Sequence, residues 1–181
     1  MEVTPEPLSH YYMLVPQCSR TQFEEKHSHP FLVRIADEDD DHDSVQFSTG
    51  KIKKEKKSRS STGAVVRSGT AQVYPIIKQP GNAFENMINV GRAPNNDLAL
   101  AYTNISKFHA FFSVDAETNT YSLTDANATN GTFVNRQRLV PDTPHLIQNG
   151  DRLGFSPQVS AYFFDSGSFH DWVCATLEEM T

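Results

Sequence analysis

The sequence predicts an all-β sandwich of two antiparallel sheets, with a short C-terminal helix and an irregular N-terminal arm. From Ala71 onward, short segments that alternate apolar and polar residues are separated by turn residues, a pattern typical of strands with one buried face. No long helical period lies among these segments. Many short strands at turn-length spacing favour a sandwich over an α/β fold.

The N-terminal region, residues 1–70, is expected to be irregular and charged. Its first twenty residues contain three prolines and little periodicity. The stretch TQFE at residues 21–24 fits a capping box, which predicts a short helix over residues 21–28 that stops before Pro30. Residues 31–35 (FLVRI) have the composition of a strand, and the sequence leaves open whether this strand joins the sandwich.

Two charged runs follow in the same region. One is acidic, DEDDDHD at residues 37–43, and the other is basic, KIKKEKKSRSS at residues 51–61. Runs of like charge are normally solvated. We weigh a tail that binds nucleic acid or a partner against an insertion whose two blocks neutralise each other, and we favour the insertion.

Residues 71–166 are expected to form the sandwich. In one segment Ala110, Phe112 and Val114 point to the same side, as a strand with one buried face requires. Asn130-Gly131 is the strongest hairpin dipeptide in the sequence, and it predicts a type I′ turn. The strands are predicted at residues 73–78, 87–90, 110–114, 121–123, 133–134, 153–155 and 161–164.

The last segment, residues 167–181, has a different period. Phe169, Trp172 and Val173 recur at helical spacing behind Ser168, a residue that can cap a helix. We expect a short helix folded back onto the sandwich, with Trp172 as its anchor.

Composition argues against several classes of function. The net charge is −6, and residues 70–181 contribute −5 of it, from 6 basic and 11 acidic side chains. Because nucleic-acid surfaces need a basic face, we expect no nucleic-acid partner. Cys18 and Cys174 are the only cysteines, and no Cys/His cluster has metal-ligand spacing, so we expect no metal and no cofactor. Without a signal-peptide pattern or an apolar run of about 20 residues, we expect a cytoplasmic protein with no membrane contact.

Polar residues of the β region concentrate in three connections, at residues 91–97, 103–109 and 125–135. In an antiparallel sandwich, loops at the same end converge and are held in fixed relation by the strands. These loops offer a guanidinium, an ammonium, hydroxyls and side-chain amides. Such a set of donors suits an anion with several oxygens.

Three motifs in these loops resemble the forkhead-associated (FHA) domain: GR at 91–92, SKFH at 106–109 and NG at 130–131, in this order and at these intervals. The resemblance runs from about residue 71 to residue 164. It implies a two-sheet sandwich whose apical loops bind a phosphothreonine-containing segment of a partner protein. It therefore implies a binding module and not an enzyme.

The resemblance also implies roles for single residues in phosphopeptide binding. Arg92 would pair with the phosphate through its planar guanidinium, and Ser106 would donate its hydroxyl to a phosphate oxygen. Lys107 would supply a second positive charge, and Thr129 would contact the phosphate or shape its pocket. Asn130 would hydrogen-bond the peptide backbone next to the phosphothreonine.

Other positions are implied to support or tune the site. His109 would tie loops together, and Gly91 and Gly131 would support the site, the latter by permitting a turn. Residues near enough in sequence to tune which residues follow the phosphothreonine are Asn104, Asn135 and Arg136.

Two other interpretations stay open. In a hydrolase, His109 would activate Ser106 and a carboxylate such as Asp125 or Asp151 would orient the imidazole. The chain has no Gly-x-Ser-x-Gly elbow and no glycine-rich phosphate loop, which disfavours catalysis. A phosphate-independent scaffold would bind partners through a sheet face and leave the apical site unused. The presence of every central motif position, including Arg92, favours a phosphothreonine-dependent signalling adaptor instead.

The partner is accordingly expected to be a protein phosphorylated on threonine, which implies a Ser/Thr kinase upstream. The N-terminal arm is itself a candidate ligand. If it were phosphorylated, the tethered segment would occupy the domain's own site at high effective concentration. Its candidate acceptors are Thr4, Thr21, Ser60, Ser61 and Thr62.

Overall fold

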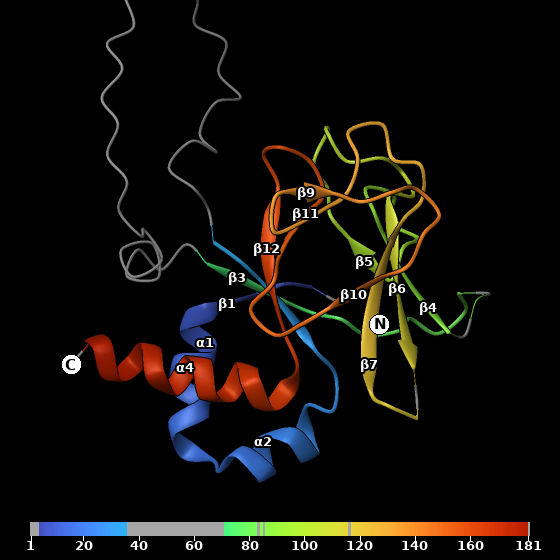
Figure 1. Ribbon diagram of the computed structural model, residues 1–181. Coiled ribbons are helices and arrows are strands. Elements are labelled where there is room, and N and C mark those ends of the chain that lie inside the picture. The colour runs from blue at the N-terminus through green and yellow to red at the C-terminus, as the bar shows by residue number, and fades with distance from the viewer. Residues whose placement is uncertain (1–3, 36–70, 83, 85, 116, 181) are drawn as a thin grey trace, which may run out of the picture.

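The computed structural model describes residues 4–35, 71–82, 84, 86–115 and 117–180. Two β-sheets form a sandwich at its centre (Figure 1), which confirms the predicted fold class. Both charged runs, at 37–43 and 51–61, lie outside the described residues.

The first sheet has seven strands, and its strand order brings the N-terminal region into the sandwich. β2 pairs with β3 on one side and with β12 on the other, so the strand that the sequence left unplaced lies inside this sheet. In register, Val33 lies opposite both Val73 and Tyr162. The strands in spatial order are β1 (Glu6–Pro7), β3 (Gln72–Pro75), β2 (Phe31–Arg34), β12 (Ser160–Phe164), β11 (Arg152–Gly154), β8 (Phe133–Val134) and β9 (Gln137–Arg138).

The second sheet has five strands and departs from the prediction in one pair. β4 and β5 run parallel, with Val90 opposite Leu98, whereas a wholly antiparallel sheet was expected. The six residues between them form a loop that returns the chain to the side of β4, so that β5 runs in the same direction as β4. The strands in spatial order are β10 (His145–Ile147), β7 (Thr120–Asp125), β6 (Ala110–Asp115), β4 (Met87–Gly91) and β5 (Leu98–Ala99).

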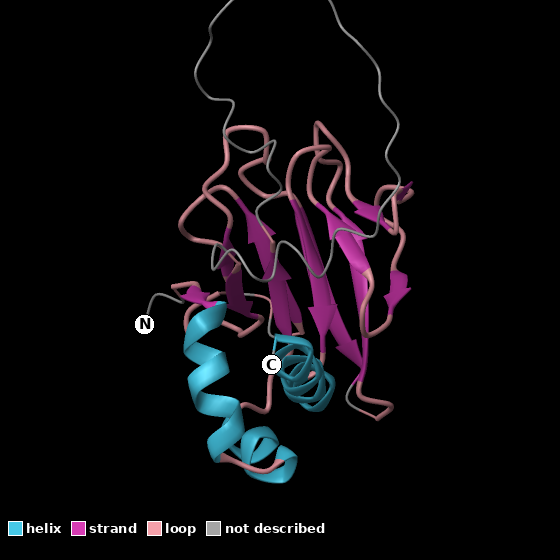
Figure 2. Cartoon of the chain, turned by 90° about the vertical axis from the view of Figure 1, so that its left-hand side faces the viewer, coloured by secondary structure: helices cyan, strands magenta, loops and turns pink. Residues whose placement is uncertain are grey.

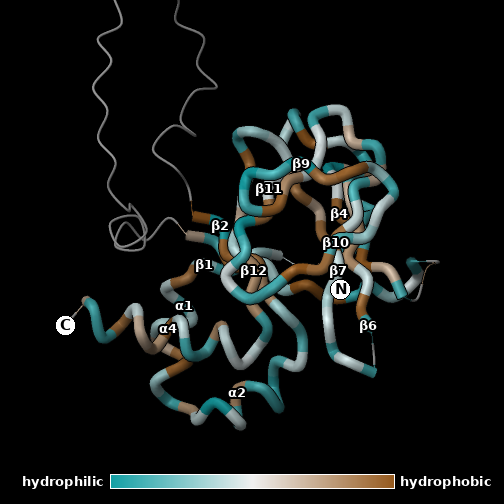
Figure 3. Tube along the Cα trace, viewed as in Figure 1, coloured by the Kyte–Doolittle hydropathy of each residue, from teal (hydrophilic) through white to brown (hydrophobic). Residues whose placement is uncertain are grey.

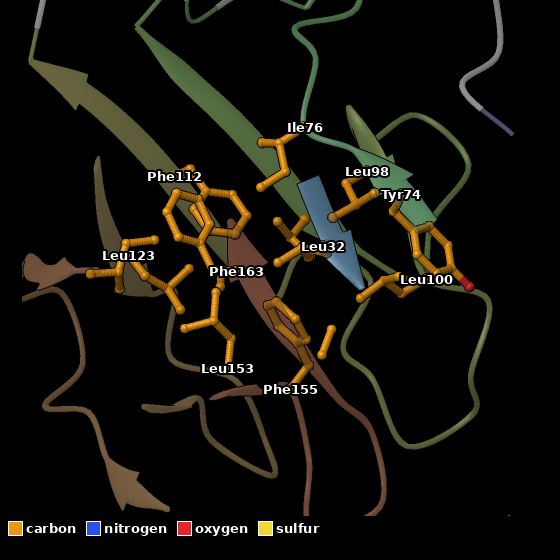
Figure 4. Close-up of a cluster of buried hydrophobic side chains, with 14 of the residues drawn as sticks. Leu32, Tyr74, Ile76, Leu98, Leu100, Phe112, Leu123, Leu153, Phe155 and Phe163 are labelled. Carbon is orange, nitrogen blue, oxygen red and sulfur yellow. The ribbon is translucent and has the colours of Figure 1, made fainter. Parts of the chain in front are cut away.

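The main hydrophobic core lies between the two sheets (Figure 4). Phe112 and Leu123 face it from the five-stranded sheet, and Leu32, Leu153 and Phe163 face it from the seven-stranded sheet. Alternation along each strand places these residues on one side, because successive side chains of a strand point to opposite faces. Figure 3 shows the resulting hydrophobic stretches, in brown, along the strands.

A second core lies on the outer face of the seven-stranded sheet, under three helices (Figure 2). The helices are α1 (Leu8–Leu14), α2 (Arg20–Lys26) and α4 (Ser166–Met180). Leu8, Tyr11 and Phe23 pack with Phe169 against side chains such as Phe31 of β2. Among the described residues, no helix combines the length and the apolar character that crossing a membrane requires.

This second core corrects the expectation that residues 1–20 are irregular. Leu8, Tyr11 and Val15 follow one another at intervals of three and four, and all three are buried. The prolines that suggested irregularity lie at helix boundaries instead. Pro7 is the N-cap of α1, and Pro16 lies in the first turn of the 3₁₀-helix Val15–Gln17, positions where a missing N–H is tolerated.

The helix starts differ by a few residues from those expected. The capping box of α2 joins Ser19 and Gln22: Gln22 N–H donates to Ser19 Oγ at 3.3 Å, and Ser19 N–H donates to Gln22 Oε1 at 3.0 Å. α4 begins at Ser166, and Asp165 Oδ1 accepts from Ser168 N–H at 2.7 Å. The cap of α4 is therefore Asp165, and the prediction of Ser168 was wrong. Asp165 binds the backbone through an acceptor that is charged and so stronger than a hydroxyl.

Phe169, and not Trp172, anchors α4. The Phe169 ring is fully buried and stacks on Phe31 with ring centroids 4.4 Å apart. Trp172 is only partly buried and stacks on Phe164 at 5.2 Å. The helix turns Phe169 and Val173 toward the core, which leaves the larger indole at its margin.

Asp97, at the end of the first polar loop, fixes that loop to the β3–β4 connection. Its carboxylate accepts from Gln79 N–H at 2.6 Å, from Asn82 Nδ2 at 2.7 Å, from Asn89 N–H at 2.7 Å and from Lys78 Nζ at 3.1 Å. Burial raises its pKa, but these four donors lower it by more, so the net pKa lies below the ordinary value.

Substitution of Phe169 by alanine is expected to destabilise the protein by about 3–5 kcal/mol, because it opens a cavity in the second core. Trp172→Ala is expected to cost less, because part of the indole is already exposed. Chemical denaturation measures both free energies of unfolding, with the exposed Met180→Ala as control. A larger loss for Trp172→Ala would contradict the assignment of Phe169 as the anchor.

Asp97→Asn is expected to lower the free energy of unfolding at pH 7 by about 2–4 kcal/mol, since buried donors lose a charged acceptor. The depressed pKa of Asp97 means that its contribution is present above about pH 4 and is lost as pH falls through the folded-state pKa. The free energy of unfolding, measured by denaturation at several pH values, should therefore fall less steeply toward acid pH in the variant than in the unmodified protein. Asp171→Asn is the control, because Asp171 is exposed and pairs with Arg20. An equal loss of unfolding free energy in Asp97→Asn and Asp171→Asn would contradict the role of Asp97 in fixing the first loop.

Candidate functional site

Three loops meet at one end of the sandwich. They are residues 92–97 after β4, residues 103–109 before β6 and residues 126–132 between β7 and β8. The β6–β7 turn lies at the opposite end of these strands, and Figures 1 and 2 show the three helices on that side, away from the polar loops. The loops are joined by direct hydrogen bonds, so their relative positions are fixed without a ligand.

Backbone contacts join the first loop to the second. Arg92 N–H donates to Ser106 O at 2.8 Å, and Ala93 N–H donates to Lys107 O at 3.2 Å. Gly91 makes this approach possible, because a Cβ at that position would lie 2.3 Å from the Lys107 carbonyl oxygen. The need for glycine here is therefore steric.

Asn96 reinforces the same junction and was missed in the sequence. Its buried side-chain amide donates to Ala93 O at 2.8 Å and to Lys107 O at 2.6 Å. Nothing in the sequence separates it from the neighbouring Asn95, which is exposed. Only the fold shows that Asn96 points inward.

Side chains join the second loop to the third. Thr129 N–H donates to Ser106 Oγ at 3.2 Å, which leaves the Ser106 hydroxyl proton available to an outside acceptor. Asn130 Nδ2 donates to Asn104 O at 2.6 Å, which leaves the Asn130 side-chain carbonyl as an acceptor. Thr129 and Asn130 are both exposed.

His109 lies beneath these contacts and is fully buried. Its Nδ1 accepts from Ser106 N–H at 3.2 Å, so the ring proton sits on Nε2, which donates to Gly131 O at 3.3 Å. Burial lowers the pKa of the imidazole, while the bond to Gly131 and the charge of Asp125 raise it by less. The ring is therefore neutral at neutral pH, and both of its nitrogens are occupied by backbone groups.

Asp125 organises the third loop from within. Its buried carboxylate accepts from Thr132 Oγ1 and, at 3.3 Å, from Ala128 N–H. These bonds orient the carboxylate toward its own loop. Asp151, the other carboxylate considered for a hydrolase, accepts from Asn135 Nδ2 at 2.7 Å.

The turn at Asn130-Gly131 is not of type I′, which corrects the sequence prediction. Gly131 N–H donates to Ala128 O at 3.0 Å, and of the two residues only Gly131 has positive φ, at 76°. A type I′ turn requires positive φ at both central residues. That geometry belongs instead to Asn135 and Arg136, with φ of 50° and 70°, between β8 and β9.

The residues expected to tune specificity are placed differently from one another. Asn104 lies in the second loop, and its Nδ2 donates to Gln158 Oε1 at 2.9 Å, a partner that the sequence did not suggest. Asn135 lies at the β8–β9 turn. Its Nδ2 donates to Asp151 Oδ1, and its Oδ1 accepts from Arg152 N–H at 3.0 Å. Arg136 is exposed at the same turn.

The cluster presents donors and positive charge to solvent. The guanidinium of Arg92 is exposed, and its Nε donates to Ile105 O at 3.1 Å, which fixes the plane of the group. Lys107, in the second loop, is also exposed. Across the described residues, no group of three His, Cys, Asp or Glu side chains is placed to hold a metal ion. The site is chemically suited to an oxyanion.

Two curated relatives match about half of the chain. The DNA damage response protein kinase DUN1 of Saccharomyces cerevisiae is 33% identical over 84 residues, which cover 43% of this chain and 16% of the kinase. The oxoglutarate dehydrogenase inhibitor of Corynebacterium glutamicum is 28% identical over 110 residues, which cover 54% of this chain and 73% of the inhibitor. The chain thus spans about a sixth of the length of the first relative.

Two solved FHA domains each match a little more than half of the chain. The N-terminal FHA domain of Rad53p from S. cerevisiae, in complex with a phosphothreonine peptide, is 20% identical with a TM-score of 0.45, over 58% of this chain and 93% of that one. An FHA domain from Arabidopsis thaliana is 27% identical with a TM-score of 0.42, over 55% of this chain and 76% of that one.

The family model for the FHA domain matches residues 88–156. This range runs from Ile88 in β4 to Ser156, just after β11, and contains all three loops. Over residues 88–156 the chain is therefore similar to the FHA domain family.

Proposed function

We propose that this domain is a phosphothreonine-dependent protein-binding module that acts as a signalling adaptor. The observation that carries the proposal is the direct bonding of the three loops, through Arg92 N–H to Ser106 O and Thr129 N–H to Ser106 Oγ. These bonds hold the backbones of Arg92, Ser106 and Thr129 close together, and Lys107 directly follows Ser106. The match of residues 88–156 to the FHA domain model and the resemblance of the loop motifs support the same ligand.

In this proposal the two cations and the serine hold the phosphate. Arg92 uses Nε on the Ile105 carbonyl, so its two terminal amino groups give parallel hydrogen bonds to phosphate oxygens. Ser106 accepts from the Thr129 N–H and donates its own proton to a phosphate oxygen. Lys107 adds a second positive charge from the exposed side of the loop.

The third loop holds the peptide that carries the phosphate. Asn130 Nδ2 already donates to the Asn104 carbonyl, so the side-chain Oδ1 accepts a hydrogen bond from a backbone N–H of the peptide. Thr129 is exposed next to it and shapes the pocket with its side chain. His109, Gly91 and Gly131 support these groups without contacting the ligand.

The energetics are consistent with a reversible signalling complex. Charge-assisted hydrogen bonds contribute about 1.5–3 kcal/mol each, so four of them give roughly 6–12 kcal/mol. Association and ordering of the peptide oppose this by several kcal/mol. With contacts to the peptide backbone included, we expect a binding free energy of about −8 kcal/mol, which corresponds to a dissociation constant near the micromolar range.

A Ser/His hydrolase finds less support in this geometry. The His109 ring accepts from the Ser106 backbone N–H and donates to the Gly131 carbonyl, so its nitrogens are committed to backbone groups. A general base needs a nitrogen within reach of the nucleophile's hydroxyl. A phosphate-independent scaffold has no specific observation in its favour.

The partner is a protein phosphorylated on threonine, and a Ser/Thr kinase acts upstream of the complex. A cytoplasmic setting fits this role. Neither a nucleic acid nor a membrane is required by the proposal.

Titration with a phosphothreonine peptide tests the proposed function directly. Arg92→Ala should weaken binding at least thirtyfold, roughly 2 kcal/mol, because it removes a charged, bidentate contact. Arg92→Lys should recover only part of this loss, since an ammonium lacks the planar fork. Ser106→Ala should weaken binding by about five- to twentyfold. Calorimetry or fluorescence anisotropy measures each constant.

The control variant is Lys26→Ala, which removes one exposed charge on α2, away from the loops. Unphosphorylated threonine and phosphoserine versions of the peptide are the control ligands. Equal affinity for the phosphorylated and unphosphorylated threonine peptides would refute the proposal and favour the scaffold.

The phosphorylated N-terminal arm is a second ligand to test. Thr21 lies within α2, so an extended bound segment would have to unwind that helix, while Ser60, Ser61 and Thr62 lie outside the described residues. Phosphorylation at Thr62 should weaken binding of an external peptide at least tenfold, because a tethered ligand reaches millimolar effective concentration. Thr62→Ala treated with the same kinase is the control. Unchanged affinity after phosphorylation of the arm would exclude this self-binding.

A further inference from the structure

A cavity of about 200 Å³ lies on the outer face of the seven-stranded sheet, apart from the three loops. Its floor is one row across three strands, where Gly154 of β11 lies opposite Phe133 of β8 and Ser160 of β12. Their neighbours Leu153 and Ala161 are buried between the sheets, so this row projects outward.

Gly154 creates the hollow. A glycine between two larger cross-strand neighbours leaves the space of one side chain empty on that face of the sheet. A Cβ at Gly154 would lie 3.2 Å from the Cβ of Phe133, so even a methyl group would crowd the floor. Pro157 also lines the cavity.

Two arginines line the cavity from different elements. Arg152 is held in place, because its Nε donates to Ser160 Oγ at 3.0 Å. Arg136 lies at the second position of the β8–β9 turn with φ of 70°, where glycine is strongly preferred. A non-glycine residue kept in this strained conformation points to a use for its side chain.

The chemistry of the cavity fits a carboxylate on a flexible stem. None of the described residues that line it is acidic, although the chain as a whole carries a net charge of −6. A planar guanidinium binds a carboxylate with two parallel hydrogen bonds. The ring of Phe133 supplies an apolar surface for the methylene groups of a glutamate.

Hydrogen bonds link the edge of the cavity to the second and third loops. Gln158, next to Pro157, accepts from Asn104 Nδ2 at 2.9 Å, and the carbonyl of Asn104 accepts from Asn130. An extended peptide advances about 3.3 Å per residue, so a few residues would carry it from the loops to the cavity. We propose, on the basis of the proposed function, that the Arg136–Arg152 cavity binds an acidic side chain of the same phosphorylated partner.

A glutamate scan tests this selectivity. A phosphothreonine peptide with otherwise neutral residues carries one glutamate, moved through five positions on each side, with glutamine at the same position as reference. Binding by fluorescence anisotropy should improve about three- to tenfold at one or two adjacent positions and not elsewhere. The readout is the glutamate-to-glutamine ratio of affinities, which cancels general effects of a variant on the phosphate site.

Arg136→Asn should bring this ratio below about twofold, and asparagine tolerates the positive φ of the turn. Gly154→Ala should also reduce the ratio, because a methyl group fills the hollow while both arginines stay. Lys26→Ala removes a distant charge and should leave the ratio intact. If phosphopeptides bind but the glutamate-to-glutamine ratio is the same at every position, or is unchanged by Arg136→Asn, the cavity does not bind an acidic side chain and the proposed function still stands. If no phosphopeptide binds, the proposed function fails with it.

Discussion

The geometry of the site depends on one neutral, buried imidazole. His109 accepts from the Ser106 N–H of the second loop and donates to the Gly131 carbonyl of the third. Only a neutral ring has one acceptor and one donor, because a protonated ring would direct an N–H at the Ser106 N–H. Burial lowers the pKa of His109 and keeps the ring in this form. The contacts of Thr129 and Asn130 with the second loop rest on this bridge.

The rest of the fold holds that bridge still. Asp97 fixes the first loop to the β3–β4 connection, and Gly91 lets the first loop approach Lys107 closely. The sandwich core sets the ends of β4, β6 and β7, from which the loops start. The helices pack on the outer face of the other sheet, around Phe169. The three helices and the second core thus lie away from the polar end of the sandwich.

The sequence predicted the sandwich and the three loops well, because both depend on local patterns. Strands with one buried face alternate residue by residue, and the loop motifs are short runs with fixed spacing. Features that depend on residues distant in sequence were not predictable. Asn96 looks like Asn95 until the fold shows which one points inward, and Gln158 reaches Asn104 across more than fifty residues.

The errors have two physical origins. The period of Leu8, Tyr11 and Val15 is helical, but prolines at helix boundaries obscured it. Asn130-Gly131 has the composition of a type I′ turn, yet the contacts of Asn130 with Asn104 and of Asp125 with Ala128 accompany another turn. The type I′ geometry formed at Asn135-Arg136, where composition gave little sign of it. At the two turns, tertiary contacts overrode local preference.

The most direct test of phosphothreonine binding at the three loops is to map which backbone amides a phosphothreonine peptide perturbs. In a two-dimensional ¹H–¹⁵N NMR titration, the account predicts the largest shifts at the amides of Arg92, Ser106, Thr129 and Asn130. The unphosphorylated peptide should leave these resonances in place. Shifts that gather on α1, α2 and α4, or that appear equally with the unphosphorylated peptide, would contradict the account.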